Sequence, residues 1–210
     1  DVNAGVYDLS ETSVSGYTPG SWTCVGGTQS GASVKLSPGQ SATCTINNDD
    51  QTARLTLHKI VINNNGGTAQ ASDFTLSAVG PTPISGAGGA DAFVNAGTYT
   101  LLEINVAGYA EGTWSCSKNG GDPVTGNSIT LGLGQSASCS ITNNDIPPKL
   151  HLRKVVVNDN GGTATVADFT LAADGSGSND LSGTSPVNSG AGLQADTWAL
   201  SESAVAGYAA

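Results

Sequence analysis

The chain repeats itself, and this internal repeat limits its fold more than any other feature of the sequence. The dipeptide Gly16-Tyr17 returns as Gly108-Tyr109 and as Gly207-Tyr208, at offsets of 92 and 99 residues. Other segments recur at similar offsets, namely Trp22-Thr23-Cys24 as Trp114-Ser115-Cys116 and Asp73-Phe74-Thr75-Leu76 as Asp168-Phe169-Thr170-Leu171. A repeat of this length has the size of one β-sandwich domain.

The repeat divides the chain into three parts. We expect residues 1–53 to be the C-terminal part of one repeat, 54–147 a complete β-sandwich repeat and 148–210 the N-terminal part of a further repeat. The second junction contains Pro147-Pro148, a short stiff spacer. Residues 1–19 align with residues 192–210, and the chain contains no Met. We therefore expect a window from a longer tandem array whose domains are arranged end to end.

Strand signals fill each repeat, and no segment shows a helical period of 3.6. Within the complete repeat, the expected strands are residues 55–62, 74–79, 92–104, 112–117, 128–133 and 136–142. Asn63-Asn64-Asn65-Gly66-Gly67 follows the first of them and predicts a tight hairpin. About seven short strands per repeat are typical of an Ig-like sandwich, so the predicted fold class is all-β with tandem sandwich domains.

Charge and motif content exclude several function classes. The formal net charge is -10, with seven Lys and Arg in total, which disfavours nucleic acid as a partner. The chain has no run of 18 apolar residues, so we expect no membrane span in this segment. It also has no Gly-x-Ser-x-Gly elbow and no phosphate-binding loop, and we expect neither enzymatic activity nor a cofactor.

Four cysteines occur as two equivalent pairs, Cys24 with Cys44 and Cys116 with Cys139. Each pair lies inside one repeat, on neighbouring expected strands. A metal site would need further ligands, and neither pair has another Cys or a His nearby. We expect two disulfides and an oxidising compartment, with free buried thiols as the alternative.

Three polar residues fall on the apolar faces of the complete repeat. Alternate residues of a strand share a face. By this parity Lys59 lies with Leu55 and Leu57, Glu103 with Tyr99 and Leu101, and Asn143 with Cys139 and Ile141. The incomplete repeats carry the matching residues Glu11 and Asn48 at one end and Lys154 and Glu202 at the other.

These residues carry a resemblance to a known family. Leu57-His58-Lys59-Ile60-Val61, the run 97–103 with Gly108-Tyr109, and Ile141-Thr142-Asn143 resemble prealbumin-like, collagen-adhesin B-type (SpaA-like) repeats of bacterial surface proteins, including pilin-related isopeptide-forming domains. The resemblance implies a prealbumin-like sandwich and an intramolecular amide, with Lys59 as nucleophile, Asn143 as electrophile and Glu103 as proton shuttle. The sequence departs from the family at Val106-Ala107, where the family has Ala-Pro, and in its cysteine pairs.

Formation of this amide is chemically feasible, and these three residues also have a simpler interpretation. Burial disfavours a charged amine, a neutral amine attacks a carboxamide, and a protonated Glu polarises the carbonyl and helps ammonia leave. The alternative is a buried Lys59–Glu103 ion pair with Asn143 hydrogen-bonded beside it.

Two weaker signals remain. Asp49, Asp50 and Asp145 lie at the junctions and are calcium candidates, with solvated turns as the alternative. The three tryptophans, Trp22, Trp114 and Trp198, are expected in the core, with carbohydrate stacking as the alternative.

The expected function is that of a structural repeat in an extracellular fibre, stalk or filament on a bacterial cell surface. The expected partners are neighbouring repeats or identical chains. The alternative is an adhesin domain that binds a host or surface ligand or a glycan. Gly/Ser-rich loops of variable length without aromatic residues, such as 81–89 and 175–180, favour the structural role.

Overall fold

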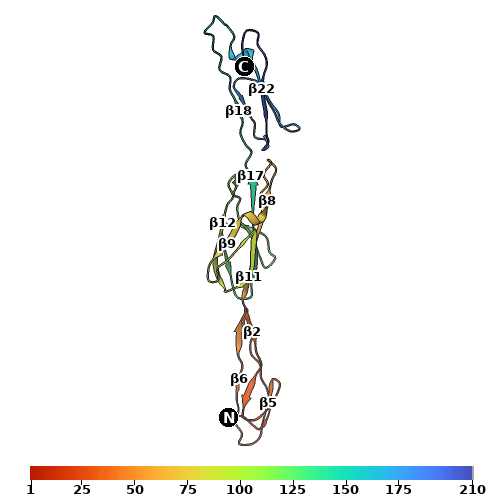
Figure 1. The fold of residues 1–210 in the computed structure, drawn as a ribbon. Helices are drawn as coiled ribbons and strands as arrows, with labels where there is room; N and C mark the ends of the chain where they lie inside the picture. The colour runs from red at the N-terminus through yellow and green to blue at the C-terminus, as the bar shows by residue number, and fades with distance from the viewer. Residues whose placement is uncertain (210) are drawn as a thin grey trace. The chain divides into compact units, whose positions relative to one another are not determined.

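The computed structural model describes residues 1–209, which form β-strands and two short 3-10 turns (Figure 1). The turns are η1 (Ala71–Asp73) and η2 (Val166–Asp168). Within residues 1–209 there is no helix with the length and apolar character that crossing a membrane requires. The all-β fold class predicted from the sequence is confirmed.

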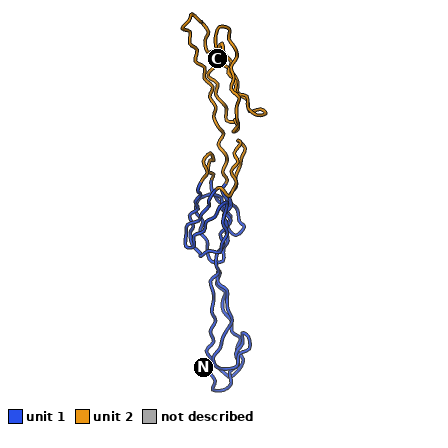
Figure 2. Tube along the Cα trace, in the orientation of Figure 1, with its two compact units in different colours: residues 1–59, 74–104, 113–141 blue, residues 60–73, 105–112, 142–210 orange. Residues whose placement is uncertain are grey.

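Contacts group the chain into two compact units, coloured separately in Figure 2. The first unit consists of residues 1–59, 74–104 and 113–141, and the second of residues 60–73, 105–112 and 142–210. The unit boundaries do not follow the sequence repeat, because two long strands begin in one unit and end in the other. These strands are β8 (Ala53–Ile62) and β17 (Ser136–Asp145).

Residues 1–50 of the first unit form three small sheets. Their strand orders are β1 (Gly5–Asp8)–β5 (Ser33–Leu36)–β4 (Thr28–Ser30), β2 (Tyr17–Pro19)–β7 (Asn48–Asp50) and β3 (Thr23–Val25)–β6 (Thr43–Thr45). Val34 is the one buried residue among residues 1–50. This part of the chain therefore has the strands of a sandwich without a developed core.

The middle of the chain forms two larger sheets. One has the order β10 (Ile84–Ala87)–β9 (Thr75–Val79)–β12 (Gly97–Ile104)–β16 (Ser128–Leu131). The other has the order β11 (Gly89–Val94)–β8–β17–β14 (Ser115–Lys118)–β15 (Val124–Thr125), and β13 (Tyr109–Ala110) also pairs with β17. Leu55 and Leu57 of β8 share a core with Leu76 of β9 and with Tyr99 and Leu101 of β12, so both sheets contribute to one sandwich core.

The strand parity predicted for β8 is confirmed. Its buried residues alternate with more exposed ones and include Leu55, Leu57 and Lys59. Antiparallel pairing with β11 matches Leu55 to Ala92 and Leu57 to Ala90. Since side chains of a strand alternate between its two faces, the lysine joins the leucines on the core face.

Two local expectations were wrong. Residues 92–104 form two strands, β11 and β12, which lie in different sheets. The chain turns between them at Asn95 and Ala96. The next strand begins at Gly97, whose φ is 151° and where an added Cβ would lie 2.6 Å from the Pro81 Cγ. Residues 63–67 do not close a hairpin either, because β8 and the following strand β9 belong to different sheets.

Residues 148–209 of the second unit form two sheets. These are β18 (His151–Leu152)–β21 (Val187–Asn188) and β20 (Leu181–Thr184)–β19 (Thr170–Asp174)–β22 (Ala199–Glu202). Leu152, Leu171, Ala173 and Val187 form their small core. The strand β18 is short and pairs with β21, whereas the matching strand β8 has a partner on each side.

Gln51 links the sheets of residues 1–50 to the middle sheets. Its backbone N–H donates to the Gly16 carbonyl at 2.7 Å, and its carbonyl accepts from the Gly134 N–H at 2.9 Å. Its side-chain amide donates to the Thr18 hydroxyl at 2.9 Å. One linker residue is therefore hydrogen-bonded to both flanking segments of the first unit.

Candidate functional site

The core of the middle sandwich contains a buried ion pair. Lys59 of β8 donates from Nζ to both carboxylate oxygens of Glu103 on β12, at 3.0 and 3.1 Å. Both side chains are completely shielded from solvent. Their strands belong to opposite sheets, so the pair crosses the sandwich. Burying two charges is costly unless they are paired, and here each charge meets the other.

An aromatic ring also lies next to the Lys59 ammonium. The Lys59 Nζ lies 4.4 Å from the centre of the Phe74 ring, a cation–π distance. Sequence parity did not identify Phe74 as part of this site. The signal was nevertheless present, because Phe74 belongs to the repeated Asp-Phe-Thr-Leu segment.

The same arrangement recurs in residues 148–209. The Lys154 Nζ donates to Glu202 Oε2 at 2.6 Å and lies 4.3 Å from the centre of the Phe169 ring. Here the Lys154 and Glu202 side chains keep 16% and 20% of their surface exposed. The repeated trio of Lys, Glu and Phe is therefore a feature of the repeat and does not depend on one local environment.

Asn143 is fully buried on β17, the strand next to β8 in the sheet. Its Nδ2 donates to Asn105 Oδ1 at 2.9 Å, and its Oδ1 accepts from the Gly112 N–H at 3.3 Å. Parity placed Asn143 inward, and the burial confirms this.

The matching asparagine of residues 1–50 contacts its glutamate directly. The Asn48 Nδ2 donates to Glu11 Oε2 at 3.2 Å, in an exposed setting. The predicted site residues therefore meet in three pairs, Lys59–Glu103, Lys154–Glu202 and Glu11–Asn48. Each of the three pairs contains the glutamate of its own repeat.

Both predicted disulfides are present. Cys24 and Cys44 face each other on β3 and β6, and Cys116 and Cys139 face each other on β14 and β17. The second pair is buried in the sandwich core, with Cys116 3% and Cys139 0% exposed. Each bond therefore joins neighbouring strands of one sheet and closes a loop within one repeat.

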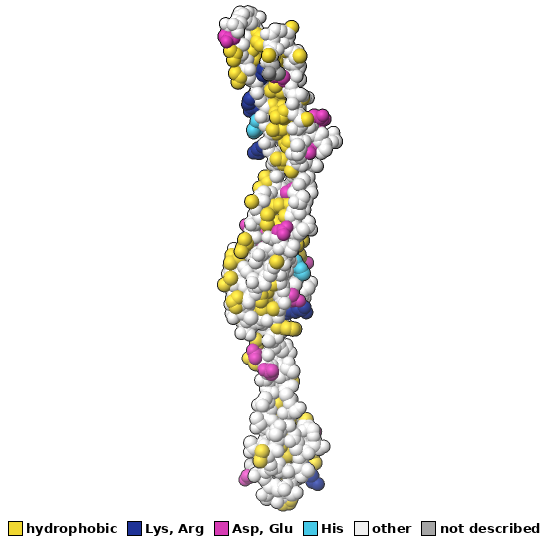
Figure 3. All heavy atoms as spheres, viewed as in Figure 1, with side chains coloured by type: hydrophobic (Ala, Val, Ile, Leu, Met, Phe, Trp, Pro, Cys, Tyr) yellow, Lys and Arg dark blue, Asp and Glu magenta, His cyan; other side chains and the backbone are white. Residues whose placement is uncertain are grey.

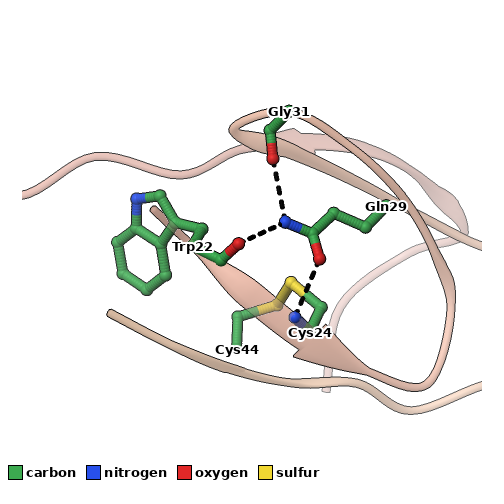
Figure 4. Close-up of a disulfide and its surroundings, with 5 residues drawn as sticks. All are labelled: Trp22, Cys24, Gln29, Gly31 and Cys44. Atoms are coloured by element: carbon green, nitrogen blue, oxygen red, sulfur yellow. Dashed lines mark hydrogen bonds between the residues drawn. A yellow bond between two sulfur atoms is a disulfide. The ribbon is translucent and has the colours of Figure 1, made fainter. Parts of the chain in front are cut away.

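The Gln29 side chain lies beside the first disulfide and is hydrogen-bonded to the backbone near it (Figure 4). The Gln29 Oε1 accepts from the Cys24 backbone N–H at 2.8 Å. The Gln29 Nε2 donates to the carbonyls of Trp22 and Gly31 at 2.6 and 2.9 Å. This single side chain fixes the loop that follows Cys24.

Asp145, a calcium candidate, instead accepts hydrogen bonds. Its carboxylate receives the backbone N–H groups of Asn64, Asn65 and Gly67 at 3.0, 2.8 and 2.7 Å. Burial alone would raise the pKa of Asp145, but these donors outweigh it and hold that pKa below its ordinary value. The carboxylate thus fixes the loop that follows β8, as an anion among N–H donors.

The other calcium candidates, Asp49 and Asp50, lie exposed on β7. Across residues 1–209, His, Cys, Asp and Glu side chains form no group of three that is suited to holding a metal ion. The exposed surface is poor in charge, and Figure 3 shows charged side chains scattered among uncharged ones. In this part of the chain we identify no cation site.

The tryptophans differ in burial. Trp114 is 4% exposed and belongs to the sandwich core, as parity predicted. Trp198 packs against the smaller core and donates from its indole N–H to the Asn179 carbonyl at 2.8 Å. Trp22 is only partly buried.

Comparison with known proteins gives a clear family. The model of the family described as "Prealbumin-like fold domain" matches three successive segments, residues 1–46, 50–141 and 145–210. A search of curated protein sequences found no match.

Solved structures with detectable similarity include two bacterial proteins. The major pilin protein T3.2 of Streptococcus pyogenes is 18% identical, with 68% of each chain covered and a TM-score of 0.39. The Bacillus anthracis TIE protein is 14% identical, with 82% of this chain and 33% of that chain covered and a TM-score of 0.42. The family match rests on almost the whole sequence, and the all-β structure agrees with it. The chain therefore belongs to the family of prealbumin-like fold domains.

Proposed function

We propose that this chain is a structural segment of an extracellular bacterial surface fibre or stalk, in which residues 54–147 form one complete repeat among repeats arranged end to end. We further propose that this repeat closes an amide bond between the Lys59 Nζ and the Asn143 Cγ, with Glu103 as proton shuttle. The observation that carries the proposal is the complete burial of the Lys59–Glu103 pair in the sandwich core.

Two incomplete copies support the same assignment. A Lys–Glu contact is present for Lys154 and Glu202, and a Glu–Asn contact is present for Glu11 and Asn48. Amide formation by a Lys, a Glu and an Asn requires two contacts, one from the glutamate to the amine and one from the glutamate to the carboxamide. Each incomplete copy has one of these two contacts. In the complete repeat the lysine and asparagine lie on adjacent strands of one sheet, β8 and β17.

The proposed step balances without an outside reagent. One proton first moves from the Lys59 ammonium to Glu103 within the buried pair, which leaves an uncharged amine. That amine attacks the Asn143 Cγ, a new C–N bond forms, and the bond from Cγ to Nδ2 breaks. The protonated Glu103 gives its proton to Nδ2, which leaves as ammonia, and takes one proton back from the attacking nitrogen. Burial favours this route because a shielded site disfavours a charged amine.

Such a bond would join the first and last strands of the repeat. Force that enters a tandem array through one of these strands and leaves through the other would then pass through a covalent link. The hydrogen bonds of the sheets would carry little of it. The disulfide between Cys116 and Cys139 joins β14 to β17 and cannot provide that path. Disulfides also fit an oxidising, extracellular setting.

The test is intact-mass measurement of the reduced protein. We expect a mass lower by one ammonia than the sequence requires, and a cross-linked peptide that contains Lys59 and Asn143 after proteolysis. The Glu103→Ala variant should keep the full mass. An unmodified mass in the wild-type protein would overturn the amide bond and leave the buried ion pair as the function of these residues.

A further inference from the structure

Asn105 has contacts that the proposed reaction has not used. It lies in the loop after β12, two residues beyond Glu103. Its Oδ1 accepts from the Asn143 Nδ2 at 2.9 Å and from the Val106 N–H at 2.8 Å, and its Nδ2 donates to the Tyr109 carbonyl at 2.9 Å. Both ends of the Asn105 amide are therefore fixed by the loop, and one end is directed at Asn143.

We propose that Asn105 is a positioning residue, which holds the Asn143 carboxamide in the orientation needed for amide-bond formation and so sets how fast the repeat reacts. This proposal rests on the function proposed above. It adds a residue that the trio of Lys, Glu and Asn does not include.

The orientation of the Asn143 amide carries the argument. With Nδ2 held by Asn105 and Oδ1 facing the Gly112 N–H at 3.3 Å, the two ends of the carboxamide have different surroundings. When an amine adds to Cγ, negative charge develops on Oδ1, where a backbone N–H already points. The nitrogen that must leave as ammonia faces an acceptor, the Asn105 Oδ1.

A freely turning carboxamide would present its oxygen and nitrogen in either order. In the reverse order, the Gly112 N–H would face Nδ2 and the Asn105 Oδ1 would face another oxygen, and both contacts would be unfavourable. Asn105 and Gly112 thus select one orientation before the reaction begins. Because Asn105 acts through Asn143, its effect belongs to geometry and not to proton transfer.

The repeats differ at this position. Counting from the glutamate to Gly-Tyr, Asn105 corresponds to Ser13 in the first segment and to Ala204 in the third. A serine hydroxyl can accept a hydrogen bond, but an alanine side chain cannot. The geometry therefore predicts that repeats with the same Lys, Glu and Asn react at different rates according to this residue.

The experiment follows the full chain during timed cell-free synthesis, with acid quench and intact-mass measurement of reduced samples. We expect Asn105→Ala to slow ammonia loss by up to about 100-fold, the size of effect that a small misplacement of reacting groups produces. Asn105→Asp retains an oxygen acceptor toward Asn143 while removing the donor to Tyr109, and should react within a few-fold of wild type. Glu103→Ala gives the unreacted baseline.

The outcomes separate this proposal from the one on which it rests. Wild-type protein that never loses ammonia overturns the amide bond itself. Wild type and Asn105→Ala reacting at equal rates overturn only the positioning role. If Asn105→Ala and Asn105→Asp are equally slow, the acceptor is not what matters and the proposal is again overturned. Protease resistance of each variant, measured on the same samples, checks that the sandwich has folded.

Discussion

The two Lys–Glu pairs of this chain have the same residues and different surroundings. Lys59 and Glu103 are fully shielded, whereas Lys154 and Glu202 keep 16% and 20% of their side-chain surface exposed. Each lysine faces a phenylalanine ring at nearly the same distance, 4.4 Å for Phe74 and 4.3 Å for Phe169. The local contacts are therefore set by the repeat itself, and the difference lies in what covers them.

Strand neighbours account for that difference. The strand of Lys59, β8, lies between β11 and β17 in its sheet. The matching strand β18 ends at Leu152 and pairs with β21 alone within the described residues. An ion pair forms without complete strands around it, but its isolation from water requires them. Excluding water strengthens the attraction between two charges and also raises the cost of leaving one of them without its partner. The same substitution should therefore destabilise the buried pair more than the partly exposed pair.

The largest contrast is expected from removing the two glutamates. Glu103→Ala leaves the Lys59 charge buried without its partner and should lower the free energy of unfolding by about 3–5 kcal/mol, in addition to any loss of the proposed amide. Glu202→Ala leaves a partly hydrated lysine and should cost about 1 kcal/mol or less. Urea unfolding followed by tryptophan fluorescence, together with protease resistance of each segment, measures both.

A double variant provides the control for this contrast. Replacing both charges in Lys59→Met/Glu103→Leu removes the ion pair without leaving a lone charge, and should restore most of the part of the loss that comes from the unpaired Lys59 charge. If the double variant were as unstable as Glu103→Ala, desolvation of an unpaired lysine would not explain the loss.

The two disulfides give a second, smaller contrast. Cys116 and Cys139 are almost completely buried, whereas Cys24 and Cys44 are only partly buried. With increasing reductant, Cys24–Cys44 should therefore open first, because thiol exchange requires access to the sulfur atoms. Alkylation followed by peptide mapping gives the order directly. Replacing Cys116 and Cys139 by Ala should cost about 3 kcal/mol, the value expected for a loop of this length.

Asp145 offers the third contrast, with Asp50 at the matching position of the first segment. Asp145→Asn removes a carboxylate that accepts three backbone N–H groups and should cost about 1–3 kcal/mol. Asp50 is exposed on β7, and Asp50→Asn should change the stability much less. Equal effects of the two substitutions would contradict the role assigned to the loop after β8.

The Asp145 contrast also depends on pH. Because the pKa of folded Asp145 lies below its unfolded value, its contribution is fully present above the unfolded pKa and is lost as the pH falls through the folded pKa. The stability difference between wild type and Asp145→Asn should therefore shrink as the pH is lowered through this range. Urea unfolding at a series of acidic pH values measures the change.

The alternation of apolar and polar residues predicted which side chains of the strands point inward. The sequence was a poorer guide to where the strands end and the chain turns. The inward positions of Lys59, Glu103 and Asn143 followed from the apolar neighbours on each strand, and the cysteine pairs followed from their duplication. The break before Gly97 was missed because residues 92–104 were predicted as one strand, although their two halves lie in different sheets. The roles of Phe74 and Asn105 depend on contacts between distant strands and loops, which parity along one strand does not reveal.

The hydrogen bonds of Gln51 have a consequence for how genes of this kind can change. Here the Gln51 backbone is matched on one side to Gly16 and on the other to Gly134, and β8 begins two residues later. One inserted residue would break one of these matches or shift β8 by a single position, which would turn Lys59 away from the core. We therefore expect related genes that encode this repeat to keep the length of this junction constant.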